Sequence, residues 1–384
     1  ASPLAMFYEQ PIISDVAPVL FLVLPINSLC VVQTVMFTRE FRFALLSKIV
    51  FVASLISGVV AVVMALAGCG IWSLVAQRLL MMGIKAAAFW WIRRWHTSER
   101  ASFKTIRELS PFSLRLLATD LISALYNNVA QLFIGKMYST HQLGFYSQAQ
   151  KLKDLPVTSS VQAIQGVTYP ALSKLSDDDA KFSEAFRRIL MLSSFVLFPA
   201  MLGFVAVAPE MFMLLLGERW MPTVPYFEIL ALSGLFYPLS VVAYNILKVK
   251  SDGRVILRLE VVKRVAMTII LAVTIPQRIS AVAWGMTAMA AIDFVVSLIA
   301  AMRYINIGVG TILRSLLPQF ILSIIMFVVL HVINPYLTLM PHWAHLLIDM
   351  LFGALAYLSL AYTFRLRAFS EALALLRGFR SKNA

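Results

Sequence analysis

Polar side chains follow one line along each of two neighbouring apolar stretches between Ser113 and Lys174. On a helix of about 100° per residue, six residues of the second stretch fall within roughly 60° of one line: Gly144, Gln148, Lys151, Thr158, Gln162 and Gln165. In the first stretch, Asn127 and Gln131 each fall within about 20° of Asp120. Charged groups and amides are costly against acyl chains, so these stripes cannot face lipid. The two stripes predict a shared, hydrated cavity on a transport pathway.

The composition is that of a membrane protein. Of the 384 residues, 60% are hydrophobic and 14% are charged. The mean hydropathy is +0.82, and soluble domains do not show this balance. Apolar windows of about 20 residues recur along the whole chain, which predicts an all-α, polytopic helical membrane protein. About eleven spans are expected, at residues 16–38, 43–66, 70–92, 113–137, 141–171, 187–208, 223–247, 256–276, 279–302, 311–333 and 344–364.

The formal net charge of +14 follows this expected topology. With these spans, 25 of the 33 basic residues fall on one side, whereas the other side holds Lys136, Arg219 and Arg278. The positive-inside rule places the basic side in the cytoplasm, so the C-terminus is expected there and the first residue outside. The basic tail after Arg365 suits anionic membrane lipids. Nucleic acid is therefore not expected as a partner.

Signatures of enzymes and of metal centres are missing from the sequence. It contains no G-x-x-x-x-G-K-[ST], H-E-x-x-H, G-x-S-x-G or G-x-G-x-x-G motif. Cys30 and Cys69 have no spacing partner, which favours simple packing. His342 and His345 flank Trp343 in an expected outer loop, so interfacial placement is favoured over metal binding. We expect no enzymatic activity, no cofactor and no metal.

One carboxylate stands apart from the polar stripes. Asp293 lies near the middle of the ninth expected span. A lone carboxylate is costly at that depth, so Asp293 is expected to be paired, protonated or functional.

Three short runs give the sequence a family resemblance. They are GFYSQAQKL at 144–152, YPALSKL at 169–175 and LGERW at 216–220. With Pro156, these runs resemble the bacterial Wzx-type oligosaccharide flippases. These flippases form a polysaccharide transporter family, in the superfamily that also contains the multidrug exporters called MATE.

The resemblance implies fourteen helices in two pseudo-symmetric lobes plus a final pair. On this pattern, residues 1–92 are the three-helix remainder of the N-terminal lobe and 93–112 a cytoplasmic connection. Residues 113–303 are then the six-helix C-terminal lobe, and 304–384 the final helix pair and basic tail. The first three family helices have no counterpart, so the sequence is expected to be a fragment. About 100 further residues with three apolar spans are expected upstream.

The resemblance also implies a function. The family moves polyprenyl-diphosphate-linked oligosaccharide repeat units across the bacterial inner membrane for surface polysaccharides such as lipopolysaccharide and exopolysaccharide. The expected partners are the lipid-linked oligosaccharide, membrane lipids and the polysaccharide polymerase machinery. Lys151 lies roughly 15 Å into its span and is the first candidate for a diphosphate-binding cation. The other substrate-binding candidates are Arg115, Lys153, Gln148, Asn127 and Gln131.

Three carboxylates are candidates for ion coupling or for ion pairs: Asp120, Asp154 and Asp293. An ion pair of Lys151 with Asp154 or Asp120 competes with the diphosphate-binding interpretation. Two other function classes also stay open. A multidrug exporter of the same superfamily would prefer an acidic, aromatic cavity, and a membrane enzyme of polysaccharide assembly would need acid–base residues in an outer loop.

Overall fold

The computed structural model describes residues 5–6, 8–40, 42–92, 103–251, 254–305, 307–337 and 340–382 of the chain. Helices account for nearly all of these residues, and none of them is in a β-strand. The all-α prediction is therefore confirmed. The chain divides into two compact units, unit 1 at Ala1–Leu121 and unit 2 at Ile122–Ala384.

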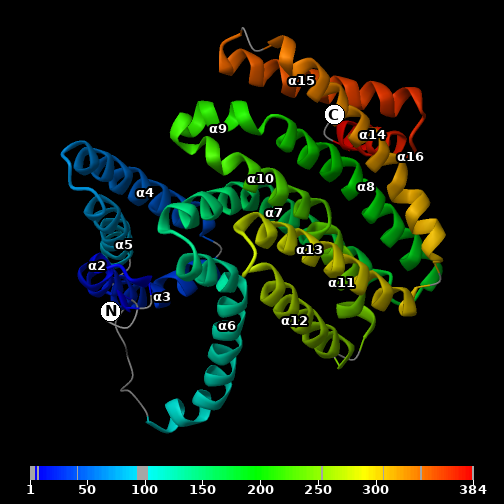
Figure 1. The fold of residues 1–384 in the computed structure, drawn as a ribbon. Helices are drawn as coiled ribbons and strands as arrows, with labels where there is room; N and C mark the ends of the chain where they lie inside the picture. The colour runs from blue at the N-terminus through cyan, green and yellow to red at the C-terminus, as the bar shows by residue number, and fades with distance from the viewer. Residues whose placement is uncertain are drawn as a thin grey trace. The chain divides into compact units, whose positions relative to one another are not determined.

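Unit 1 is built from hairpin-forming apolar helices. In chain order it contains α2 (Ile12–Phe21), α3 (Val23–Arg39), α4 (Phe43–Leu66), α5 (Trp72–Ile92) and the first part of α6 (Phe103–Met137), with α2 to α5 in blue in Figure 1. The α4–α5 turn holds Gly68 and Gly70 at φ of 82° and 52°, a conformation that residues without a Cβ adopt freely. Phe37 and Phe89 pack with ring centroids 5.5 Å apart, beside the buried Cys30.

Unit 2 continues α6 and carries the remaining helices. They are α7 (Thr140–Lys174), α8 (Asp179–Ala206), α9 (Ala208–Leu216), η1 (Glu218–Thr223), α10 (Val224–Ala231), η2 (Leu232–Leu235), α11 (Tyr237–Lys250), α12 (Arg254–Thr274), α13 (Ile279–Ala301), η3 (Met302–Tyr304), α14 (Val309–Leu337), α15 (His342–Thr363) and α16 (Arg367–Lys382). Helix α8 packs along α14, and α11 packs against both α7 and α13 (Figure 1). Each of the eleven expected spans coincides with a helix or a helical run in the two units.

Seven helical segments of the described residues are long and apolar enough to cross a membrane. They are Ile12–Arg39, Phe43–Leu66, Asp179–Ala206, Glu218–Lys250, Ile279–Tyr304, Val309–Tyr336 and His342–Thr363. The other four expected spans coincide with α5, α6, α7 and α12, which have 21, 35, 35 and 21 residues. At 1.5 Å per residue these helices are also long enough, but polar and charged side chains lower their hydropathy. The chain is a multi-pass membrane protein.

The seventh expected span is not one regular helix. It runs through η1, α10, η2 and α11, with Pro225 and Pro238 at the starts of α10 and α11. Proline is tolerated in a first helical turn, where its missing N–H would have no partner. In η2 the residues Ser233, Gly234 and Leu235 are buried. Irregular backbone at membrane depth is stable where protein surrounds it or where it lines a cavity.

Helix α7 separates the core of unit 2 from a polar face. Its buried side chains Tyr146, Ala149 and Val157 join the main hydrophobic cluster, whereas Lys151 and Thr158 are exposed. The helix begins at Ser139, whose Oγ accepts a hydrogen bond from the Gln142 N–H at 3.2 Å. The polar stripe expected on this helix therefore lies outside the packed core.

Helix α8 also begins at a capping side chain. Oδ1 of Asp178 accepts a hydrogen bond from the Lys181 N–H at 3.0 Å, and Oδ2 lies 2.9 Å from the Lys181 ammonium. This backbone hydrogen bond, followed by the ammonium contact, holds the pKa of the Asp178 carboxyl below its usual range.

Candidate functional site

A polar cavity of about 660 Å³ lies inside the helix bundle of unit 2. It is lined by residues of α7, α10, η2, α11, α12 and α13, and we call it the central pocket. Among its lining residues, the charged ones are Lys153, Asp154, Lys248, Glu260, Lys263, Arg264 and Asp293. Seven charged side chains around one cavity in an apolar bundle require water or a polar ligand inside it.

An ion pair joins two helices at the wall of the central pocket. The ammonium of Lys263 in α12 pairs with Oδ1 of Asp293 in α13. The Ser240 hydroxyl donates to Oδ2 of Asp293 at 2.7 Å. The two charged side chains are only 11% and 16% exposed, so the pair holds the two helices in a fixed register. The sequence left three states open for Asp293, and the structure shows it paired.

Aromatic rings also contact the cations of this wall. Lys263 and Lys248 lie over the ring of Tyr244, at 5.0 Å and 5.2 Å from its centroid. Arg264 lies over the ring of Tyr126 at 4.9 Å. The negative face of an aromatic ring stabilises a nearby cation without neutralising its charge. The ring contact therefore leaves Lys248, which has no carboxylate within 4.0 Å among the described residues, able to attract an anion.

A second cavity, of about 420 Å³, is lined by Lys151 and is called the Lys151 pocket. Nε2 of Gln131 in α6 donates a hydrogen bond to Oε1 of Gln150 in α7 at 3.0 Å, and both residues line this pocket. Gln150, Asp154 and Thr158 line the Lys151 pocket and the central pocket alike, so the two pockets are adjacent. Gln131 of the α6 stripe and Lys151 and Thr158 of the α7 stripe thus line one cavity.

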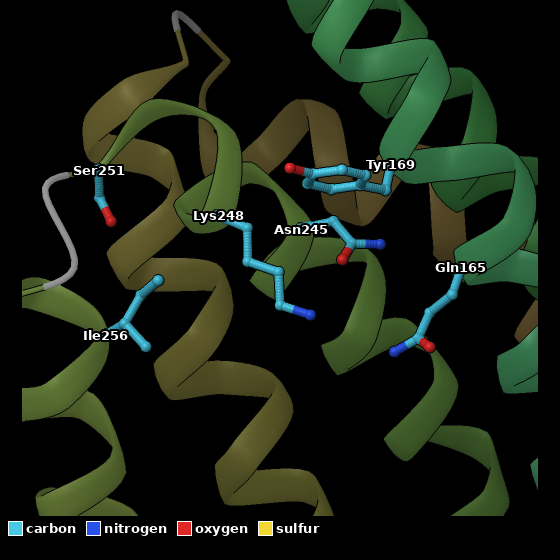
Figure 2. Close-up of a pocket in the computed structure, with 6 residues that line it drawn as sticks. All are labelled: Gln165, Tyr169, Asn245, Lys248, Ser251 and Ile256. Atoms are coloured by element: carbon cyan, nitrogen blue, oxygen red, sulfur yellow. The ribbon is translucent and has the colours of Figure 1, made fainter. Parts of the chain in front are cut away.

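A third cavity, of about 550 Å³, lies where α7 approaches the α11–α12 connection and is called the Tyr169 pocket. Figure 2 shows Gln165 and Tyr169 on one side of it and Lys248 and Asn245 on the other. Asn245 is 1% exposed, and its Nδ2 has no hydrogen-bond partner among the described residues. Gln165 and Lys248 also line the central pocket. The Tyr169 pocket therefore extends the polar region toward the ends of α7 and α11.

The structure brings only some of the expected site residues together. Lys151 and Gln131 line the same pocket, whereas Lys153 lines the central pocket and lies 2.6 Å from Oδ1 of Asp154. Gln148 is half-buried and lines none of the three pockets. The side chains of Arg115, Asn127 and Asp120 lie outside the described part of the structure. Binding and coupling roles for all nine candidates remain predictions.

Several pocket residues were not expected from the sequence. The sequence pattern predicts Lys248, Lys263 and Arg264 to be cytoplasmic basic residues, because they lie near expected span ends. The ion pair of Lys263 and Asp293 could have been predicted from the α12–α13 hairpin. The two residues lie at similar distances along the chain from the turn near Gln277. Such a register brings the two residues side by side in an antiparallel helix pair.

The interfacial placement expected for His345 is wrong. His342 is exposed at the start of α15, as an interfacial residue would be, but His345 one turn later is 3% exposed. The cause is the packing of α15 against α9, which covers this face of the first turns of α15.

A family model described as "Polysaccharide biosynthesis protein" matches residues 1–225. The teichuronic acid biosynthesis protein TuaB of Bacillus subtilis (strain 168) is 23% identical over 238 residues, which are 60% of this chain and 48% of that protein. The succinoglycan biosynthesis transport protein ExoT of Rhizobium meliloti (strain 1021) is 26% identical over 270 residues, 70% of this chain and 54% of that protein. The chain spans about half of the length of these curated relatives.

A solved structure has a similar fold. The lipid II flippase MurJ in its inward closed conformation superposes with a TM-score of 0.60 and 14% sequence identity. The superposition covers 81% of this chain and 66% of the flippase. At this identity the likeness shows a common arrangement of helices.

Proposed function

Because the chain belongs to the polysaccharide biosynthesis protein family, we propose that it is part of a flippase for lipid-linked oligosaccharides. The family expected from the runs at 144–152 and 169–175 is the one whose model matches. The proposed substrate is an oligosaccharide repeat unit on a polyprenyl diphosphate, and the proposed location is the bacterial inner membrane, with the C-terminus in the cytoplasm. The observation that carries the proposal is the set of polar, partly cationic pockets within the membrane helices of unit 2.

The diphosphate is the obstacle that such a protein has to overcome. Transfer of a bare anion into hydrocarbon costs tens of kcal/mol by Born estimates. Fixed cations and water in a cavity offset most of that cost, provided that the cations are not already neutralised by carboxylates. The cations of interest are therefore those that line a pocket and have no acidic partner.

Two lysines meet this condition. Among the described residues, Lys151 and Lys248 have no carboxylate within 4.0 Å, and both line pockets. The other pocket cations are engaged: Lys153 with Asp154, Lys263 with Asp293 and Glu260, and Arg264 with Glu260. We assign Lys151 and Lys248 as the cations that bind the diphosphate.

The sugar units would be held by neutral groups. Gln131 and Gln150 line the Lys151 pocket, and Gln165, Tyr169 and Asn245 line the Tyr169 pocket. Amides and phenols both donate and accept hydrogen bonds, which suits sugar hydroxyls. Aromatic faces additionally bind the C–H faces of sugar rings. The lipid tail would stay in the bilayer while the head group occupies the pockets.

The carboxylates of the pockets are assigned a supporting role. Asp154 and Asp293 are each paired with a lysine, so their first role is to hold Lys153 and Lys263 in place. The coupling ion would have to displace such a pair or use Asp120. The polymerase machinery of the same polysaccharide would receive the translocated unit.

The test is reconstitution of the purified full-length protein into vesicles with a fluorescent polyprenyl-diphosphate oligosaccharide. We expect labelled head groups to reach the opposite leaflet in a protein-dependent way, and no efflux of a cationic dye. Dye efflux without head-group translocation would instead assign the protein to the multidrug exporters. Chemical turnover of the labelled substrate would favour the membrane-enzyme alternative.

A further inference from the structure

A buried cluster of one histidine and two carboxylates joins α9 to α15, away from the three pockets. Nδ1 of His345 lies 3.3 Å from Oε1 of Glu210, and Nε2 lies 3.2 Å from Oδ2 of Asp349. His345 and Asp349 are four residues apart on α15 and therefore lie on one face of it. The side chains of His345 and Asp349 are 4% and 1% exposed, and that of Glu210 is 14% exposed.

The cluster holds two carboxyl groups against one imidazole. Burial makes an ionised carboxylate costly unless a positive charge or hydrogen bonds compensate it. Oε2 of Glu210 and Nε2 of His345 are buried without a hydrogen bond among the described residues. Nε2 thus lies 3.2 Å from a carboxylate oxygen without a hydrogen bond to it, as a nitrogen that binds a different partner would.

We propose that Glu210, His345 and Asp349 form a binding site for a divalent metal ion of the zinc class. One ligand atom from each residue lies within 4.8 Å of the other two. In a tetrahedral zinc site with bonds of about 2.0–2.2 Å, ligand atoms are about 3.4 Å apart, so small side-chain movements complete the site. Two carboxylates, one neutral imidazole and a divalent cation sum to zero charge.

The ligand atoms that the three side chains offer favour some metal ions over others. One imidazole nitrogen and two carboxylate oxygens match zinc, whereas magnesium and calcium prefer oxygen donors alone. The set contains no thiolate or thioether, which soft copper(I) prefers. Three protein ligands leave a fourth position for water.

The site would connect segments that are far apart in the sequence. Glu210 lies in the first turn of α9, which directly follows α8, and His345 and Asp349 lie in the first two turns of α15. A metal ion there would tie the last helix pair to the end of α8. This structural role is independent of oligosaccharide transport.

The experiment uses the purified full-length protein, stripped with a chelator and reloaded with zinc. We expect about one zinc ion per chain by elemental analysis and a rise of about 5 °C in the apparent melting temperature. Glu210→Gln and His345→Gln should each lose both effects. His342→Gln is the matched control, because His342 is exposed three residues before His345 and should leave both effects unchanged.

Two results would overturn the site. One is zinc bound to the same stoichiometry in Glu210→Gln as in the unmodified protein. The other is a protein that takes up no zinc on reloading and whose stability responds to pH but not to zinc, which would identify a protonated imidazole between two carboxylates. Should His345→Gln fail to fold, Glu210→Gln decides, because Glu210 is the most exposed of the three ligands.

Discussion

The ammonium of Lys153 lies 2.6 Å from Oδ1 of Asp154, so the nearest acidic residue to Lys151 along α7 is already engaged by its other neighbour. A structural ion pair between Lys151 and Asp154 was the main rival to a diphosphate-binding role for Lys151. The observed pair weakens that rival, while Asp120, the other acidic candidate, has its side chain outside the described part of the structure.

The first prediction concerns Lys151. In the full-length protein, Lys151→Ala should lower polymer export at least about tenfold, because a charge-assisted hydrogen bond contributes about 1.5–3 kcal/mol. Lys151→Arg should keep much of the export, since the charge remains. Export is measured as surface polysaccharide, with membrane insertion checked by immunoblot. Recovery of export in Lys151→Ala combined with Asp154→Ala or with Asp120→Ala would show that a structural ion pair was the role of Lys151.

The second prediction concerns the pair of Lys263 and Asp293. Lys263→Met leaves the Asp293 carboxylate without its cation, which costs about 3–5 kcal/mol. Asp293→Asn should cost less, because Glu260 still lies 3.8 Å from Lys263. The double variant should be more stable than the less stable single variant, because it removes both charges. A thermal unfolding series in detergent measures the coupling as a double-mutant cycle. Additive effects of the two substitutions would contradict the pairing.

The sequence predicted where the helices lie, but it did not predict which residues line the cavities. Hydropathy and length predicted a helix or helical run at each expected span, because a membrane helix must satisfy its own backbone hydrogen bonds. The stripe on α7 was also predictable, since the 3.6-residue period separates Lys151 and Thr158 from Tyr146 and Ala149. The pocket between α7, α11 and α13 was not, because it depends on which helices become neighbours in space.

The cluster of Glu210, His345 and Asp349 shows the same limit. The spacing of His345 and Asp349 already placed them on one helical face. Glu210, however, lies more than a hundred residues earlier in the chain, and only the packing of α9 against α15 brings it to them. The proximity of His345 to Trp343 therefore predicted an interfacial position for His345. The fold instead buries this side chain.

The third prediction tests the packing of α12 against α13. A Cβ on Gly285 would lie 2.9 Å from Cγ2 of Ile270 and 3.1 Å from Cγ2 of Thr274. Both neighbours are β-branched and have little freedom to move, so Gly285→Ala should destabilise the protein by about 1–3 kcal/mol. Gly203→Ala is the control, since its Cβ would meet Cε of Met326 at 3.9 Å, and alanine favours a helix by about 0.5–1 kcal/mol. Equal melting temperatures for the two variants would argue against close packing at Gly285.

The fourth prediction is the membrane topology. Reporter fusions near Ser139 and Pro222 should report the outer side, and fusions near Asp178 and Ser251 the cytoplasm, because the basic residues concentrate on the second side. A fusion near Ser98, which lies outside the described residues, should also report the cytoplasm. The readout is paired alkaline phosphatase and fluorescent protein activity. Reversed signs at any two of these positions would refute the topology.

The last prediction separates binding from stability at Lys248. Among the described residues no carboxylate lies within 4.0 Å of Lys248, so Lys248→Gln leaves no buried acid without a partner. Its contact with the Tyr244 ring, at 5.2 Å, contributes about 0.5–1 kcal/mol at most if partly hydrated. The melting temperature should therefore change little, while the apparent KM for the lipid-linked oligosaccharide should rise about tenfold.

The matched control for Lys248 is Lys174→Gln. Lys174 is an exposed cation in the last turn of α7 and lines none of the three pockets. It should leave both the melting temperature and the apparent KM unchanged, because a fully solvated charge contributes little to either. If Lys174→Gln raised the KM as much as Lys248→Gln does, general attraction of the anionic substrate to a basic surface would explain the effect, and the Tyr169 pocket would lose its assigned role.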